Sequence, residues 1–347
     1  MSKLACPVLV FAKTFCVSHK NMNRLTISNL LIPIMKLSCW KDQELDDEKL
    51  GALLVLISAA GFGTLGVLGK LAFIAGLPIP TVLALRFAIG SVVFLLLLGL
   101  DHARRRKRRE RRCELDSEHF SLCLTARELA VAVGLGALGY AAMSGLFFWG
   151  LEFMPVGMVA IVLYTYPVFV VVLSAIVLKE KVTRYTMIAL ILSFGGVVLI
   201  TGTDHVHVDP HGVAIILGAA IVYAAYITVS RSVLSTIDAR ALTAHVLPSA
   251  AITFLIYGKI TDQLMLPVTA YGWMVVIILA VIATAVPVFA FFAGLSRIGA
   301  NRASILSTFE PVVTILLGAA LLGELLTSIT ILGGIMVLAG AILVHKA

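Results

Sequence analysis

The chain has 347 residues, of which 60% are apolar and 13% are charged, and its mean hydropathy is +1.03. A soluble globular protein typically carries about 25% charged residues, so this composition excludes a soluble globule and predicts a multi-pass membrane protein. The net charge is +8, and the arginines and lysines at residues 104–109 contribute much of it. Such runs are typical of cytoplasmic loops in membrane proteins. We therefore expect no nucleic acid partner, with contact to anionic lipid as an open alternative.

The first 49 residues hold no apolar segment long enough to span a bilayer. An apolar stretch follows Lys3, but the small-residue cleavage site of a signal peptide does not follow it. We expect residues 1–49 to form a dispensable cytoplasmic tail, and translation could begin downstream at Met22 or Met35. The five cysteines are spaced neither as a zinc site nor as a disulfide framework. We expect no metal and no cofactor.

Ten apolar runs follow, each close to the ~20 residues that a membrane-spanning helix needs. They cover residues 50–74, 79–100, 128–149, 156–178, 184–202, 212–231, 240–258, 270–295, 301–323 and 325–345. We predict an all-α membrane protein in which ten transmembrane helices form two five-helix units, at 50–202 and 212–345. The first unit carries a basic cytoplasmic loop over 101–127, and an external linker over 203–211 joins the units.

The two units are copies of one another. Residues 150–180 align with 294–324 at a shift of 144 without a gap. The identities in this register include Gly150/Gly294, Leu151/Leu295, Ile161/Ile305, Pro167/Pro311, Val168/Val312, Leu178/Leu322 and Glu180/Glu324. At the start of the units the shift is 161, which aligns Gly51 with Gly212. Because each copy has an odd number of helices, the two must lie upside down relative to one another, as an inverted repeat.

The basic residues predict which side of the membrane each loop faces. With the N-terminus in the cytoplasm, the predicted inner segments hold 24 of the 27 lysines and arginines. Positive charge accumulates on the cytoplasmic side, so we predict that both termini are cytoplasmic and that the protein lies in the cell membrane.

Two prolines interrupt equivalent helices. Pro167 and Pro311 each remove a backbone donor, which leaves the carbonyls of Leu163 and Ser307 without their usual helical partners. The breaks are either plain packing kinks or the discontinuous helices that supply binding sites in transporters.

Charged residues inside the spans are the strongest candidates for a functional site. Glu310 is the one acid clearly within a span, Arg86 lies in the second span, and Lys70 lies near the end of the first. A charge at mid-membrane costs at least ~3 kcal/mol, so each needs a structural partner, an interface or a functional role. We expect Glu310 to be a coupling site, with Arg86 as its partner or as a contact for an anionic substrate group. His245 lies near the position equivalent to Arg86 and is a weaker candidate.

Aromatic residues offer a second set of candidates. They either line a cavity or mark the membrane interfaces. The set consists of Trp149, Tyr164, Tyr166, Tyr223 and Tyr226. Tyr166 takes the position of Glu310 in the first unit.

Other motifs have ordinary explanations. Residues 61–66 and 134–139 match G-x-G-x-x-G, but they lie within predicted membrane helices, where small residues let backbones approach closely. Three histidines and two aspartates at 204–211 could bind zinc, but a polar turn before Pro210 is favoured. The chain has neither a nucleophile–base arrangement nor a phosphate-binding loop, so we predict that it is not an enzyme.

The repeated motifs resemble those of the drug/metabolite transporter superfamily, in its ten-helix EamA-like branch. The resemblance rests on residues 160–167 leading to 178–180, and on residues 303–311 leading to 322–324. It implies a ten-helix inverted repeat that moves small metabolites across the inner or plasma membrane, usually outward and without ATP. The long tail and the arginine-rich loop depart from the compact pattern of this family.

We therefore predict a secondary transporter that exports small metabolites or drug-like amphipathic molecules by alternating access, with proton coupling at Glu310. Three other classes stay open: a membrane-anchored sensor or scaffold that uses the basic loop, an intramembrane enzyme, and a passive channel.

Overall fold

A computed structural model describes residues 47–112, 124–170, 173, 184–201, 209–307, 309–324 and 327–343. All regular structure in these ranges is helical, which agrees with the predicted all-α class. Six helices among the described residues are long and apolar enough to cross a membrane. They are Asp47–Ile74, Ile79–Leu100, Ala126–Phe153, Pro210–Val233, Ala239–Ile260 and Ala270–Ile298. Three shorter apolar helices follow Pro155, Ser307 and Thr327.

Helix bounds follow the predicted spans with local breaks. Up to residue 201 the elements are α3 (Asp47–Gly63), α4 (Leu65–Ile74), α5 (Ile79–Arg112), α6 (Ala126–Gly134), the π-helical segment η1 (Leu135–Tyr140), α7 (Ala141–Phe153), α8 (Val156–Leu163) and α10 (Arg184–Thr201). The later elements are α11 (Pro210–Val233), α12 (Ala239–Ile260), α13 (Ala270–Ala280), the π-helical segment η2 (Val281–Ala285), α14 (Val286–Ser307), α15 (Phe309–Leu322) and α16 (Ser328–Leu343).

Side-chain caps explain where several helices begin. Thr125 and Glu128 form a capping box at α6, in which each side chain bonds the other residue's backbone N–H. Asp209 accepts from the amide of His211 at the start of α11, where Pro210 fits the first helical position. Asp238 accepts from the amide of Arg240 at the start of α12.

Two predicted loops are helical where the structure describes them. Helix α5 continues to Arg112, into the predicted loop 101–127, because arginine and lysine favour helix formation. Helix α14 runs through residues 296–300, between the predicted spans 270–295 and 301–323. We predicted that the helices end near residues 100 and 295 because charged residues follow there. A charged side chain does not interrupt backbone hydrogen bonding, so the helices can continue.

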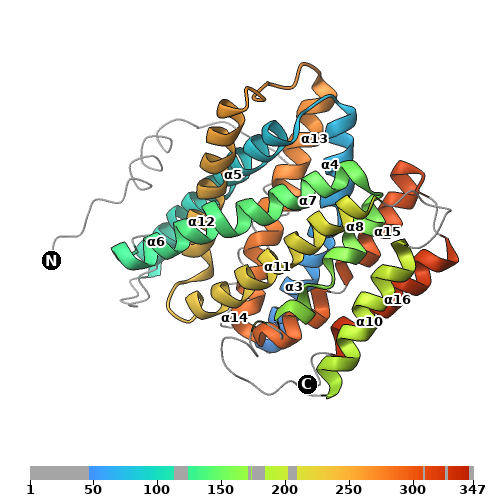
Figure 1. Cartoon of the computed structure of the whole chain (residues 1–347). Helices are drawn as coiled ribbons and strands as arrows, with labels where there is room; N and C mark the ends of the chain where they lie inside the picture. Colours follow the sequence, from blue (N-terminus) through green and yellow to red (C-terminus); the bar gives the residue numbers. More distant parts are fainter. Residues whose placement is uncertain are drawn as a thin grey trace.

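Equivalent helices of the two predicted units pack against one another. Helix α5 packs on α12 and α10 on α16, and the repeat alignment pairs the same helices (Figure 1). Helix α8 packs on α15, and both lie within the equivalent predicted spans 156–178 and 301–323. Helix α3 packs along α14, and the equivalent helices α11 and α7 pack in the same way. This arrangement encloses a buried interior formed by residues from both halves.

The α3–α14 and α11–α7 contacts use equivalent glycines. A Cβ on Gly294 would lie 2.9 Å from the carbonyl oxygen of Gly51. At the other contact, a Cβ on Gly212 would lie 2.7 Å from the Cβ of Phe153, and one on Gly150 would overlap Ile216. Small residues that let helix backbones approach are typical of membrane helix pairs.

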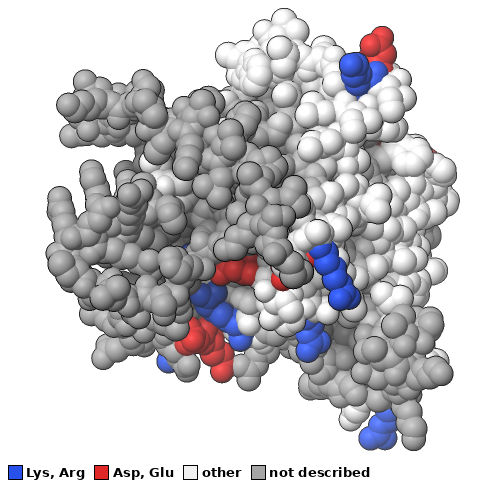
Figure 2. Space-filling view, turned by 90° about the vertical axis from the view of Figure 1, so that its left-hand side faces the viewer, with Lys and Arg blue, Asp and Glu red and all other residues white. Residues whose placement is uncertain are grey.

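The exposed surface is poor in charge between its ends. On the face in view, a pair of opposite charges at the top is separated by a broad uncharged surface from the charged side chains lower down (Figure 2). Exposed apolar side chains such as Leu96, Val198, Ile252 and Ile335 contribute to the lateral surfaces of the helices. This distribution fits a protein whose flank faces lipid.

Candidate functional site

Arg86 lies fully buried on α5, with 0% of its surface exposed. Its Nε donates to the hydroxyl of Thr284 at 2.8 Å, and its Nη2 donates to the hydroxyl of Tyr140 at 3.3 Å. The guanidinium carbon lies 4.5 Å from the ring centre of Phe87 and 5.4 Å from that of Phe148. The third nitrogen, Nη1, has no hydrogen-bond partner among the described residues.

Tyr140 and Thr284 are the functional candidates that sequence reasoning missed. They are equivalent at the repeat shift of 144, and each lies at the end of a π-helical segment, η1 for Tyr140 and η2 for Thr284. Thr284 donates its own hydroxyl hydrogen to the carbonyl of Leu279, so its oxygen is free to accept from Arg86. Single-turn π-helices occur frequently at functional sites. The repeat alignment alone could have singled out this pair.

Glu310 lies in the first turn of α15, mostly buried, and accepts a hydrogen bond from the hydroxyl of Tyr164 at 3.0 Å. The same hydroxyl also donates to the carbonyl of Ser307. That carbonyl is the one predicted to lose its helical partner to Pro311. A tyrosine of the first unit thus supplies a hydrogen-bond partner for a backbone carbonyl of the second.

Pro167 follows a break in its helix, and Pro311 lies near the start of the described part of α15. Helix α8 ends at Leu163, two residues form a turn, and helical structure resumes at Tyr166 with Pro167 in its first turn. Pro311 likewise lies in the first turn of α15. Proline suits a first turn because the missing N–H has no partner to lose there.

A row of five buried tyrosines connects Glu310 with Arg86; below it is called the tyrosine row. It consists of Tyr164, Tyr166, Tyr223, Tyr226 and Tyr140, none more than 8% exposed. Successive ring centres lie 5.5, 4.7, 6.4 and 5.4 Å apart. The hydroxyl of Tyr164 bonds Glu310 at one end, and that of Tyr140 bonds Arg86 at the other. Four of these tyrosines were predicted site residues.

The predicted direct partnership of Glu310 with Arg86 is wrong for this structure. Within the described residues Arg86 bonds Thr284 and Tyr140, and no ion pair joins it to Glu310. The aromatic side chains of the tyrosine row lie in sequence between the two groups. Sequence reasoning paired the two charges because it could not place the tyrosines.

Trp149 and His245 do not join the tyrosine row. Trp149 is 44% exposed and packs edge-on against Phe153 and His211, so it belongs to the outer surface of α7. His245 is buried on α12, but its Nδ1 contacts the carbonyl of Ala241 in its own helix at 2.7 Å. The spacing that suggested His245 was off by one or two residues, which turns a side chain by 100–200° around a helix.

Lys70 has its electrostatic partner elsewhere. It is half-buried on α4 and is attracted by Glu324, not by Glu310. The carboxylate of Glu324 accepts from the amides of Val156 at 2.7 Å and Gly157 at 3.1 Å, and so caps α8. The cap ties the start of α8 to the chain that follows α15.

The predicted external loop at 204–211 is described only in its last residues, 209–211. Asp209 caps α11, and the ring of His211 packs on Phe153 and Trp149. Within the described part of the chain, no group of three or more histidine, cysteine or acidic residues is placed to hold a metal. Residues 204, 205 and 207 lie outside the described residues.

Comparison with known proteins agrees with this architecture. The chain is 26% identical over 268 residues to an uncharacterized transporter of Archaeoglobus fulgidus, covering 76% of this chain and 87% of the relative. It is 27% identical over 300 residues to the uncharacterized transporter YwfM of Bacillus subtilis, covering 85% and 94%. A crystal structure described only as that of a protein shares the fold, with a TM-score of 0.61 at 16% identity over 84% of this chain and 95% of the other.

The model of the EamA-like transporter family matches two segments, residues 49–202 and 210–345. Together these segments account for well over half of the 347 residues. The chain therefore belongs to the EamA-like transporter family and is a multi-pass membrane transporter of small molecules.

Proposed function

We propose that this transporter is a secondary exporter of small metabolites or drug-like amphipathic molecules, acting by alternating access in the cell membrane. The observation that carries the proposal is the tyrosine row, with Arg86 at one end and Glu310 at the other. Each charge costs at least ~3 kcal/mol to place inside a span, and neither is neutralised by the other. Aromatic rings with two opposite charges at the ends suit a solute that has both polar and apolar parts.

Alternating access needs two halves that can exchange their arrangement, and the packing supports such halves. We propose ten transmembrane helices in an inverted repeat, with units at 50–202 and 212–345 and both termini cytoplasmic. Equivalent helices pack as pairs, and equivalent glycines lie at the α3–α14 and α11–α7 contacts. Arg86 is held by the equivalent residues Tyr140 and Thr284. Binding at the interface between repeats is the usual arrangement in secondary transporters.

The hydrogen bonds of Tyr164 support proton coupling at Glu310. A tyrosine hydroxyl has one hydrogen, so it cannot fully satisfy both the carbonyl of Ser307 and a charged Glu310. When Glu310 is protonated, it can donate to Tyr164, and Tyr164 can donate to Ser307 without competition. The other titratable groups near Glu310 are the hydroxyls of Tyr166, Tyr223 and Tyr140. Protonation of Glu310 would therefore change the hydrogen bonding of the Ser307 carbonyl at the end of α14.

Glu310→Gln tests this proposal because glutamine keeps the shape and removes the titration. Metabolite profiling of cells with and without the protein first ranks the solutes, and counterflow in proteoliposomes then measures transport between about pH 5.5 and 8.5, a range in which coupled carboxylates titrate. We expect the variant to lose the pH dependence and to retain pH-independent exchange. Glu152→Gln is the matched control, since Glu152 is exposed at the end of α7. An unchanged rate and pH profile in Glu310→Gln would show that Glu310 is structural.

A further inference from the structure

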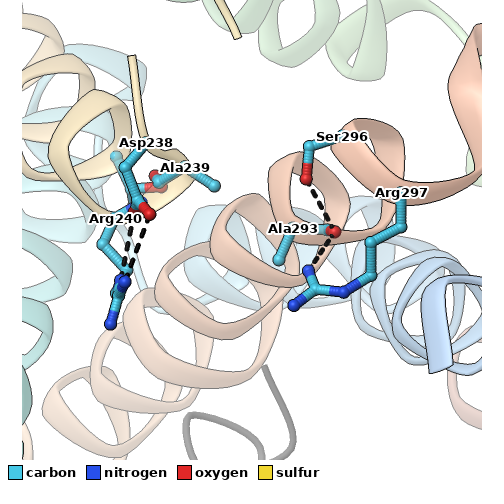
Figure 3. Close-up of polar contacts among 7 residues, drawn as sticks. Asp238, Ala239, Arg240, Ala293, Ser296 and Arg297 are labelled. Carbon is cyan, nitrogen blue, oxygen red and sulfur yellow. Dashed lines mark hydrogen bonds and ion pairs between the residues drawn. The ribbon is translucent and has the colours of Figure 1, made fainter. Parts of the chain in front are cut away.

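One part of Arg86 is unused by the protein. An arginine has five N–H donors, and Arg86 donates from Nε and Nη2 but has no partner at Nη1 within the described residues. Arg240, in the first turn of α12, and Arg297, in the middle of α14, show the ordinary arrangement (Figure 3). Arg240 pairs with Asp238 at 3.0 Å, and Arg297 donates to the carbonyl of Ala293 at 2.6 Å.

The charge of Arg86 also has no counterion in the described part of the chain. Its bonded neighbours Thr284 and Tyr140 are neutral, and the rings of Phe87 and Phe148 lie beside the guanidinium. Cation–π contact offsets only part of the cost of burying a cation. Because the guanidinium group is always charged, one positive charge at this end of the tyrosine row has no compensating negative charge among the described residues.

The remaining donors indicate the chemistry of the missing group. Arg86 uses Nε for Thr284 and one N–H of Nη2 for Tyr140, so both N–H groups of Nη1 and the second N–H of Nη2 stay available to a ligand. It offers the N–H groups of Nη1, and Tyr140 offers its hydroxyl hydrogen, for which the described residues supply no acceptor. One negative charge neutralises one guanidinium, whereas a dianion would leave an excess charge in a low-dielectric interior. These features favour a monoanion such as a carboxylate.

We propose that Arg86 and Tyr140 bind the single carboxylate of a small organic acid, whose flat apolar body lies against the tyrosine row. The rings of Tyr140 and Tyr226 are stacked with centres 5.4 Å apart, next to Phe87 at 5.3 Å from Tyr140. Aromatic surface of this kind binds planar apolar groups through offset or edge contacts. This inference deepens the proposed function, since it assigns the substrate class of the same site.

Binding to the full chain in detergent tests the assignment without requiring transport. The midpoint of thermal unfolding is measured against concentration for sodium phenylacetate, neutral phenylacetamide, phenyl phosphate and sodium chloride. A ligand that binds only the folded protein raises this midpoint in a concentration-dependent way. We expect phenylacetate to stabilise the protein, phenylacetamide and chloride to have little effect, and phenyl phosphate to bind at least tenfold more weakly than phenylacetate, because of its second charge.

Variants then locate the effect. Arg86→Gln should remove the stabilisation by phenylacetate, whereas Arg240→Gln, at a partly exposed arginine that pairs with Asp238, should retain it. If Arg86→Gln does not fold, Tyr140→Phe keeps the ring contacts and removes one donor. Loss of one hydrogen bond to a charged group should weaken phenylacetate binding about tenfold or more.

Three results would overturn the assignment: equal stabilisation by phenylacetate and phenylacetamide, stabilisation by chloride alone, or unchanged phenylacetate binding in Tyr140→Phe. Counterflow separates this failure from a failure of the proposed function. If only neutral solutes show saturable exchange, the protein is still a transporter, but its substrate is not an organic acid and the assignment at Arg86 fails. An absence of saturable exchange for every profiled solute would contradict the transporter proposal, while binding of phenylacetate would still report on Arg86.

Discussion

At the residue scale, a few polar groups from the two halves form hydrogen bonds with one another inside an apolar helix bundle. Thr284 accepts from Arg86 and donates to the carbonyl of Leu279 in α13, and the single hydroxyl hydrogen of Tyr164 is shared between the carbonyl of Ser307 and the carboxylate of Glu310. Buried polar groups without partners cost roughly 1–3 kcal/mol each. Because each of these groups depends on another for a hydrogen bond, a substitution at one residue should change the energetics of its bonded neighbour more than those of a distant charge.

This dependence gives a prediction for Arg86 and Glu310. The two are not ion-paired in the structure, so Arg86→Gln and Glu310→Gln should reduce initial transport rates nearly additively in free energy, within about 0.5 kcal/mol. Tyr164→Phe and Glu310→Gln share a hydrogen bond and should be clearly non-additive. Rates of the single and double variants in proteoliposomes measure both couplings. A strong coupling between Arg86 and Glu310 would mean that the two meet directly in another state of the cycle.

At this scale, sequence reasoning singled out candidates where a residue departs from the apolar background. Arg86, Glu310 and four tyrosines of the row stand out because charge and hydroxyl groups are costly in a membrane span. It failed for Thr284, which is an unremarkable residue in an apolar helix until its contact with Arg86 is known. It also failed for Trp149, because exposure to the outer surface depends on how α7 is rotated.

At the element scale, breaks in the helices determine which backbone groups are available. The turn after α8 precedes Pro167, where the sequence predicted a break, and Pro311 lies in the first turn of α15. The π-helical segments η1 and η2 carry no proline and came from packing that a single sequence does not reveal. The prediction that the helix ends where the charged residues begin was also wrong at residues 101–112, where α5 continues.

The prolines should differ in their effects although they are equivalent in the repeat. Pro311→Ala would give the carbonyl of Ser307 a backbone donor and release Tyr164 to Glu310. We expect Pro311→Ala to reduce transport and shift its pH profile, with membrane abundance nearly unchanged. Pro167→Ala should reduce transport without a pH shift, because the partner of Glu310 stays in place. Parallel measurements of flux and abundance check this, and identical pH profiles in the two variants would contradict it.

A glycine in η1 tests close helix packing. A Cβ on Gly136 would overlap the carbonyl oxygen of Val246 and lie 2.8 Å from the Cβ of Ser249 on α12. Gly136→Ala should therefore lower the free energy of unfolding by roughly 1–3 kcal/mol, the range for overpacked sites. Gly99→Ala is the control, because a Cβ on Gly99 meets nothing within 4 Å. Thermal unfolding in detergent compares the two. Equal midpoints would show that α12 can move away from η1 at little cost.

At the scale of the whole molecule, the repeat relates most of the features of the site. Equivalent helices pack as pairs, and the residues that hold Arg86 are equivalent. The sequence predicted the repeat because duplicated motifs persist in a single chain. It could not predict which equivalent residues would meet, since that depends on helix rotation and crossing in three dimensions.

Membrane orientation is the last prediction at this scale, and it rests on the 24 of 27 basic residues assigned to inner segments. All five cysteines fall in segments 1–49 and 101–127, which are predicted to be cytoplasmic. The wild-type chain should therefore resist a membrane-impermeant maleimide in intact cells and react after permeabilisation. Val208→Cys places a thiol in the predicted external linker and should react without permeabilisation. The cysteines and residue 208 lie outside the described residues, so the test is independent of the helix packing. Labelling of the wild-type chain in intact cells, together with protection of position 208, would reverse the predicted orientation.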